Sequence, residues 1–162
     1  MRMDFRTGDK TPEKDELSDR FASQIGQRFS MNWHIWNAER TQRVLVMVSK
    51  DGHCLNDLMH RYKTGSLPIE IAGVVSNHED MHSMVEWHGI PYHFLPVTKE
   101  TKAEQEKQVW ELVQKHHIDL VVLARYMQIL SPELSKKLAG RAINIHHSFL
   151  PSFKGAKPYH QA

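Results

Sequence analysis

Apolar residues recur in a regular pattern from Arg43 onward. Continuous β-branched and apolar runs predict buried strands at 44–48, 69–75, 91–97, 120–124 and 142–145. The segments between them carry apolar residues at helical spacing, as in the series Cys54, Leu55, Leu58, Met59 and Tyr62. Strands that alternate with helices indicate βαβ units, and continuous apolar strands indicate a sheet covered on both faces. The pattern therefore predicts an α/β fold with a Rossmann-like open, mainly parallel sheet and helices on both faces.

Polar residues predict where several of these helices begin. Asn77, followed by Asp80, is a plausible cap for a helix that carries Met81, Met84 and Val85 and ends at Gly89. Thr101 and Glu104 have the spacing of a capping box. The tripeptide 131–133 combines a serine cap, a proline in the first turn and an acid, which predicts a further helix start.

Residues 1–41 have a different pattern. Met1–Phe5 alternates weakly, like the end of a strand, and MNWHIW at 31–36 predicts a short strand. Between them, a four-residue spacing of apolar side chains predicts an amphipathic helix over 15–29, with the stripe Leu17, Phe21, Ile25 and Phe29. One strand–helix–strand of this length cannot close a core by itself, so we expect it to be part of a larger unit.

Composition narrows the class of protein. The 162 residues are 40% hydrophobic and 25% charged, which is typical of globular proteins. The net charge of +2 gives no support to a nucleic-acid-coating protein. No apolar run reaches bilayer length and the N-terminus lacks a signal peptide, so we expect a cytoplasmic protein without membrane or nucleic-acid partners. The single cysteine, Cys54, excludes an internal disulfide and a cysteine-based zinc site.

Charge is uneven along the chain. Residues 121–162 carry six basic side chains and a single acid, Glu133. Two interpretations are open: a solvated basic face, or a region that binds a carboxylate or phosphate.

The candidate chemistry lies where strands end, because ligands of open α/β sheets bind beyond the carboxyl ends of the strands. Three loops leave those ends, at 49–53, 125–130 and 146–159. Alternation places Asn144 and His146 on the same side of the last strand. A carboxamide that donates to an oxyanion, beside an imidazole that moves a proton, suits acyl or formyl transfer or hydrolysis of the same bond. The alternative is a structural role for both residues.

Other motifs argue against phosphate, dinucleotide and metal sites. The loop at 49–54, SKDGHC, has one glycine beside an acid and is a poor phosphate cradle. No G-x-G-x-x-G follows the first strand. His78 and His82 are four residues apart, but no third ligand is evident, so we expect no metal site.

Three segments resemble the formyltetrahydrofolate deformylases, within the folate-dependent formyltransferase superfamily. They are NIHHSFLPSFKGAKPYHQA at 144–162, ARYMQILSPE at 124–133 and VSKDGHCLNDL at 48–58. The resemblance runs from about Arg43 to the last residue. The Asn-Ile-His core identifies only the superfamily, whereas the double histidine and the PYHQA ending are more specific to deformylases.

The resemblance implies hydrolysis of 10-formyltetrahydrofolate to formate and tetrahydrofolate, without a separate cofactor and with formate supplied to purine synthesis. It implies that Asn144 polarises the formyl oxygen and that His146 stabilises the tetrahedral intermediate or shuttles its proton. It also implies a substrate-binding set in which Met127 and Ile129 form apolar walls for the pterin. That set is Arg125, Tyr126, Met127, Gln128, Ile129, Leu130, His147 and Ser148. Arg125 either faces the folate tail's carboxylates or is solvated.

The resemblance further implies a partial ACT-like regulatory segment at 1–36, a linker at 37–42 and the N-terminal part of a catalytic domain at 43–162. The family's catalytic aspartate would lie beyond Ala162, so we expect a chain truncated at both ends, poorly stable and possessing reduced or no activity. A homo-oligomer is expected for the full-length protein. The alternatives are a formyltransferase with an amine acceptor such as glycinamide ribonucleotide, which the poor phosphate loop disfavours, and a non-catalytic folate- or nucleotide-binding module.

Overall fold

The computed structural model of the chain describes residues 3–37 and 40–144 and divides into two compact units, Met1–Arg40 and Thr41–Ala162. The larger unit contains a five-stranded parallel sheet with strand order β3-β2-β1-β4-β5. Its strands are β1 (Gln42–Val48), β2 (Ile69–Ser76), β3 (Tyr92–Phe94), β4 (Leu120–Leu123) and β5 (Ala142–Asn144). The sheet confirms the predicted open, parallel α/β architecture.

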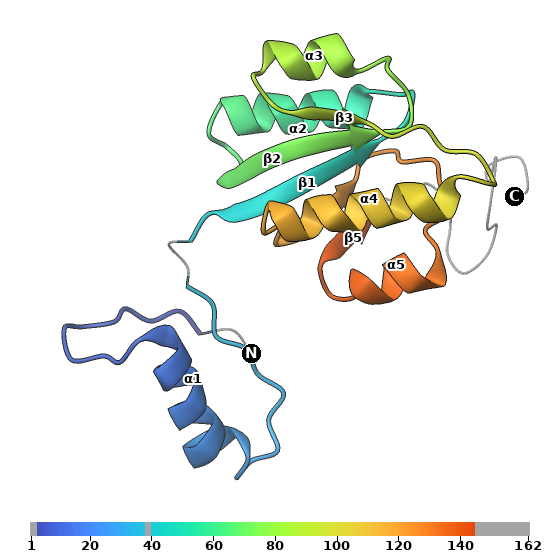
Figure 1. Cartoon of the computed structure of the whole chain (residues 1–162). Helices are drawn as coiled ribbons and strands as arrows, with labels where there is room; N and C mark the ends of the chain where they lie inside the picture. Colours follow the sequence, from blue (N-terminus) through green and yellow to red (C-terminus); the bar gives the residue numbers. More distant parts are fainter. Residues whose placement is uncertain (1–2, 38–39, 145–162) are drawn as a thin grey trace, which may run out of the picture. The chain divides into compact units, whose positions relative to one another are not determined.

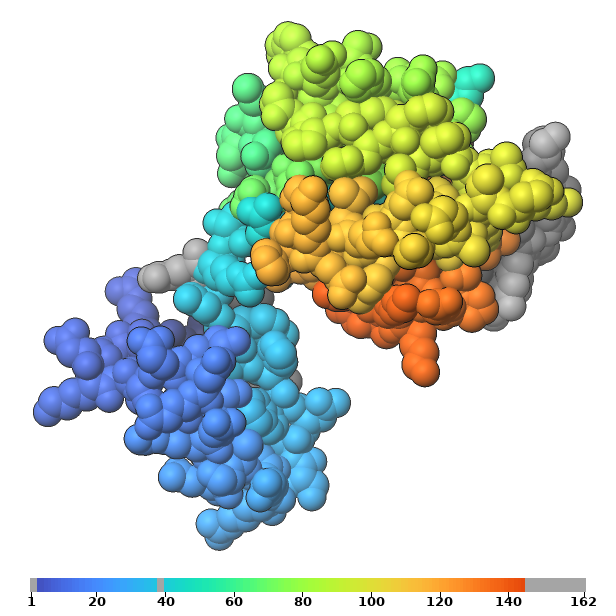
Figure 2. Space-filling view, viewed as in Figure 1, coloured from blue at the N-terminus to red at the C-terminus, as the bar shows by residue number. Residues whose placement is uncertain are grey.

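Helices cover both faces of the sheet (Figure 1). They are α2 (His53–Lys63), α3 (His82–Trp87), α4 (Lys102–Lys115) and α5 (Pro132–Lys137). Alternation along β1 divides the core in two. Val44, Val46 and Val48 pack in the cluster with residues of α2 and α3, whereas Leu45 and Met47 pack in the cluster with residues of α4 and α5. Figure 2 shows α4 and α5 side by side on the second face, in yellow to red.

The strand order reverses its direction at β1. The chain builds outward through β2 to β3 on one side, then crosses to place β4 and β5 on the other. Met47 of β1 lies opposite Leu123 of β4, which lies opposite Asn144 of β5. These residues form a row near the carboxyl ends of the strands, where ligands of such sheets bind.

One of the three predicted side-chain helix caps is confirmed. The Ser131 hydroxyl accepts a hydrogen bond from the Leu134 N–H at 3.1 Å at the start of α5. The Asn77 prediction was wrong, because α3 begins after Met81 and the Asn77 side chain bonds to Ser49 instead. Thr101 is the N-cap residue of α4, as predicted, but the side-chain bond of the expected capping box does not form. The Thr101 hydroxyl accepts from the Thr98 N–H within the preceding turn, and that local bond competes with capping.

The described residues of the N-terminal unit form one helical segment. Helix α1 (Lys14–Phe21) continues as a π-helical turn, η1 (Ala22–Gly26), so the predicted helix over 15–29 ends earlier than expected. Trp33 packs edge-on against Phe21 and covers Gly26, where a Cβ would collide with its indole. The predicted strands at Met1–Phe5 and 31–36 were wrong for the described residues, which form no strand there. A strand needs a partner for its backbone groups, and the described part of this unit supplies none.

Two boundaries in the larger unit also differ from expectation. The strand predicted at 91–97 pairs only over Tyr92–Phe94, next to β2 at the edge of the sheet. The last strand is described as far as Asn144, so the predicted Ile145 lies outside the described residues. Within the described part of the chain, no helix is long and apolar enough to cross a bilayer.

Candidate functional site

The carboxyl edge of the sheet gathers the loops that follow β1, β2 and β4. Two were predicted, at 49–53 and 125–130, and the sequence analysis missed the third, the turn at 77–81 after β2. The predicted loop at 146–159 lies outside the described residues. The segment 125–131 bonds to the loop after β1 and to helix α4, and it is called the β4 loop below.

The start of the β4 loop is tied to the end of β1. The Ala124 N–H donates to the Met47 carbonyl at 2.8 Å, which extends the ladder between the two strands. The Met127 N–H then donates to the Ser49 hydroxyl at 2.9 Å, and that hydroxyl donates to the Asn77 side-chain oxygen at 2.7 Å. Ser49 is only 3% exposed. One buried hydroxyl therefore joins the loops that follow three neighbouring strands.

Helix α4 supports the rest of the β4 loop from the other side. The Gln105 amide donates to the Tyr126 hydroxyl at 3.0 Å, and a Glu106 carboxylate oxygen accepts from the Ser131 N–H at 2.8 Å. The Lys102 ammonium donates to the carbonyl of Ile129. Burial raises the pKa of Tyr126 above its ordinary value, so this phenol stays protonated over the physiological pH range.

Side chains of the β4 loop point in two directions. Tyr126 is buried and Leu130 packs against the core between the sheet and helices α4 and α5, so these two predicted substrate-binding residues anchor the loop. Met127 is 53% exposed and Ile129 is 86% exposed. Gln128 is half-buried. Met127 and Ile129 therefore point toward solvent, whereas Tyr126 and Leu130 point toward the core.

Arg125, predicted either to face the folate tail or to be solvated, makes an ion pair within the chain. Its guanidinium donates to Asp51 at 2.7 Å, across from the β4 loop to the loop after β1. Its backbone has a φ of 58°, in the left-handed region that non-glycine residues seldom adopt. The Arg125 Nε is buried without a hydrogen-bond partner among the described residues. The described structure therefore pairs the partly exposed Arg125 side chain with an acid of the same chain, and its contact with the folate tail stays a prediction.

Asn144 is exposed at the end of β5, directly opposite Leu123, the last residue of β4. The carboxamide is therefore on the strand next to the one that leads into the β4 loop. His146, His147 and Ser148 lie outside the described residues. Their predicted roles consequently have no described geometry.

The single glycine of the first loop has a packing role. A Cβ at Gly52 would collide with the sulfur of Met81, so only glycine fits there unless Met81 moves. The neighbouring Asp51 holds Arg125 and places a carboxylate in the loop. A loop with an acid at its centre is a poor binding site for a phosphate, as the sequence predicts.

A hollow of about 840 Å³ lies between the N-terminal ends of α4 and α5. Its lining includes Lys99, Lys102, Lys137, Ser131 and Pro132. Lys102 also bonds to the β4 loop, so the hollow adjoins that loop at the carboxyl edge of the sheet.

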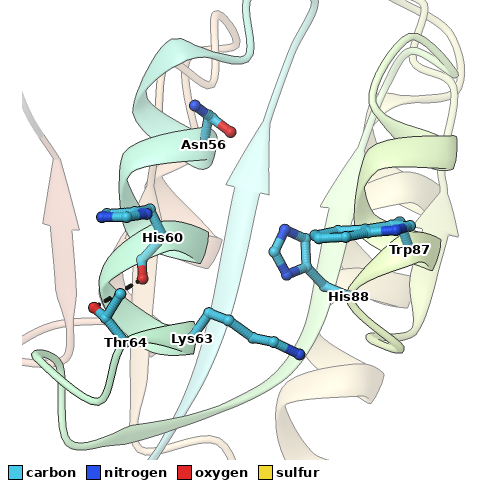
Figure 3. Close-up of a pocket in the computed structure, with 6 residues that line it drawn as sticks. All are labelled: Asn56, His60, Lys63, Thr64, Trp87 and His88. Carbon is cyan, nitrogen blue, oxygen red and sulfur yellow. Dashed lines mark hydrogen bonds between the residues drawn. The ribbon is translucent and has the colours of Figure 1, made fainter.

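A second hollow, of about 280 Å³, lies between α2 and α3. In Figure 3, Lys63 extends from α2 toward His88 and Trp87, whose rings are in edge contact. This hollow includes none of the predicted site residues; Asn56, His60 and Lys63 of α2 line it from the helix side. Among the described residues, no three His, Cys, Asp or Glu side chains are grouped so as to hold a metal ion.

Comparison with known proteins agrees with this arrangement. A family model described as "Formyl transferase" matches residues 42–162. The chain belongs to the formyl transferase family. The family match covers the whole described sheet, including Asn144 and the β4 loop.

Several relatives of this chain are deformylases. A formyltetrahydrofolate deformylase from Corynebacterium sp. (strain P-1) is 52% identical, over 100% of this chain and 56% of the relative. A deformylase structure from Burkholderia mallei superposes with a TM-score of 0.81 at 52% identity, over 91% of this chain and 52% of the other. A phosphoribosylglycinamide formyltransferase from Bacillus halodurans gives a TM-score of 0.66 at 32% identity, over 74% and 63%. The chain thus spans about half the length of the deformylases that it matches.

Sequence reasoning missed the residues that hold the β4 loop. Ser49, Gln105 and Glu106 were not among the predicted site residues, although all three are buried polar side chains in contact with the loop. A signal existed for the two on α4. Gln105 and Glu106 lie four and three residues before the buried Val109, on its side of the helix, which marks polar residues at core positions.

Proposed function

We propose that this chain carries the folate-binding part of an enzyme that hydrolyses 10-formyltetrahydrofolate to formate and tetrahydrofolate. Support comes from family membership and from the 52% identity to a formyltetrahydrofolate deformylase over the whole chain. The single observation that carries the proposal is the position of Asn144. It is exposed at the carboxyl end of β5, beside the strand that leads into the β4 loop.

In the proposed reaction, water adds to the formyl carbon while the Asn144 carboxamide donates a hydrogen bond to the formyl oxygen. That bond strengthens as the oxygen becomes an oxyanion, so it stabilises the transition state more than the substrate. The bond between the formyl carbon and the folate nitrogen then breaks, the proton from water ends on that nitrogen, and formate leaves. His146 is proposed to stabilise the tetrahedral intermediate or to shuttle this proton.

The β4 loop is proposed to bind the pterin. Met127 and Ile129 would lie against the flat ring, and the backbone between them would meet its polar edge. Exposure of both apolar side chains in the unliganded chain supports this, because large apolar side chains exposed together often mark binding surfaces.

Several wider predictions accompany this proposal and rest on the family resemblance. They are an ACT-like regulatory role for residues 1–36, a homo-oligomer for the full-length protein and a supply of formate for purine synthesis. His147 and Ser148 are proposed to line the same substrate pocket.

The test is formate release from 10-formyltetrahydrofolate by this chain, with Asn144→Ala and His146→Ala beside it. Loss of one oxyanion donor typically lowers the rate by about 10²–10³-fold, and we expect at least that for Asn144→Ala. Asn56→Ala, an exposed carboxamide on α2, is the matched control and should keep full activity.

Two outcomes would replace the proposal. If tetrahydrofolate is released only when glycinamide ribonucleotide is present, and no formate forms, the enzyme is a formyltransferase with an amine acceptor. Tetrahydrofolate binding without turnover, retained when the part of a deformylase relative that this chain does not cover is supplied, would indicate a non-catalytic folate-binding module.

A further inference from the structure

Buried polar side chains in the described structure are concentrated around one loop. Four polar or charged residues are buried: Ser49, Ser76, Gln105 and Glu106. Three of them bond directly to the β4 loop, and only Ser76 does not. Burying a polar group is unfavourable unless its hydrogen bonds are satisfied, so this concentration indicates a specific requirement at the loop.

The three contacts are spread along the whole β4 loop. Gln105 holds the ring of Tyr126 near its start, Ser49 holds the amide of Met127, and Glu106 holds the amide of Ser131 at its end. The exposed Met127 and Ile129 lie between these fixed points. Their backbone is therefore fixed before any ligand arrives.

We propose that Ser49, Gln105 and Glu106 are positioning residues that hold the β4 loop as a preformed platform for the folate ring. This inference rests on the proposed function and adds to it a division of labour within the site. Met127 and Ile129 touch the ligand, while the three buried residues act through the loop backbone. A preformed loop lowers the entropic cost of binding, so their removal weakens affinity without removing any ligand contact.

The decisive experiment compares two buried serines at the ends of neighbouring strands. Ser49→Ala removes the bonds to Met127 and Asn77. Ser76→Ala removes the bond from the His78 N–H and a side-chain contact with Tyr92, neither of which involves the β4 loop. We expect both variants to lower the melting temperature by similar amounts. Tetrahydrofolate binding, measured by fluorescence titration, should weaken about tenfold for Ser49→Ala and stay within twofold for Ser76→Ala.

A conservative variant tests whether Glu106 acts through its hydrogen bond to the β4 loop or through its negative charge. Glu106→Gln keeps a side-chain oxygen that accepts from the Ser131 N–H, whereas Glu106→Ala leaves that amide without this partner. We expect tetrahydrofolate affinity within twofold of the unaltered chain for Glu106→Gln and about tenfold weaker for Glu106→Ala.

Amide hydrogen exchange tests the same inference without any folate. In Ser49→Ala the amides of residues 127–131 should exchange at least about tenfold faster, while those of β1 and β2 keep their protection. If the unaltered chain does not bind tetrahydrofolate, the proposed function fails, and exchange at the β4 loop alone decides the positioning role. Equal weakening of binding by Ser49→Ala and Ser76→Ala, or unchanged loop exchange in Ser49→Ala, would overturn the inference.

Discussion

The two compact units use similar sequence patterns with opposite results. In the larger unit, apolar residues of β1 alternate between two clusters, and Val44 through Val48 are at most 1% exposed. In the N-terminal unit, Leu17 and Phe21 of the predicted stripe are only half-buried, Ile25 is 40% exposed, and Phe29, beyond the end of η1, is 64% exposed. Among the described residues of that unit, only Gly26 is buried.

The difference shows what an amphipathic pattern does and does not provide. It defines the face that an element can bury, but burial requires a second surface of matching shape. Helices α2 and α4 have the sheet beside them in the same unit, and α1 and η1 have only a short stretch around Trp33. The exposed Phe29 and Trp36 would therefore gain from any additional surface.

The largest expected effect is the difference in unfolding free energy between a core substitution in the larger unit and an exposed substitution in the N-terminal unit. Leu45→Ala removes a side chain that is 1% exposed and should lower the free energy of unfolding by about 2–5 kcal/mol. Phe29→Ala, at 64% exposure, should change it by no more than about 0.5 kcal/mol. Urea denaturation followed by circular dichroism measures both. A comparable loss in Phe29→Ala would show that the N-terminal stripe is packed in solution.

A medium effect is expected at the helix starts. Ser131→Ala removes the cap of α5 and should cost about 1 kcal/mol in the same measurement. Glu13→Ala alters the corresponding position of α1, where no side-chain cap bond exists, and should cost less than about 0.5 kcal/mol. Equal losses of unfolding free energy in Ser131→Ala and Glu13→Ala would contradict the expected difference between the two helix starts.

The smallest expected effect is on the pH dependence of the larger unit's stability. Burial lowers the pKa of His93, and the neighbouring His116 and Lys115 lower it further. The unfolded chain therefore binds a proton more readily, so the stabilisation is full above about pH 6.5 and declines as pH falls through the folded pKa. Melting temperatures between pH 7.5 and 5 should fall less steeply in His93→Asn. Identical slopes for the two proteins would exclude this histidine as a cause.

Much of the larger unit could be predicted because its signals are local. The apolar runs located all five strands, and the Ser131–Glu133 tripeptide located the start of α5. The side-chain cap bonds expected from Asn77 and Thr101 do not form because each side chain has a competing partner, Ser49 and Thr98 respectively. Partners in other loops or in the preceding turn are not visible in a helix-start pattern.

The candidate site was predicted in part for the same reason. The motif at 124–133 marked the β4 loop, and the apolar run of the last strand placed Asn144 near its carboxyl end, as observed. The pairing of Arg125 with Asp51, 74 positions apart, could not be predicted from spacing. Nor could the contacts of Ser49 with Asn77 and Met127, which depend on β1 lying between β2 and β4.

The sequence by itself determined the class of fold, the order of its elements and the residues with suitable chemistry, because hydrophobic period and residue type are properties of short segments. Only the tertiary structure decided which of those residues meet. Strand order brings Ser49 to Met127, and the packing of α4 brings Gln105 and Glu106 to the β4 loop. The physical reason is that a buried hydrogen bond needs two groups within about 3 Å in a common orientation, and only the packed chain imposes that.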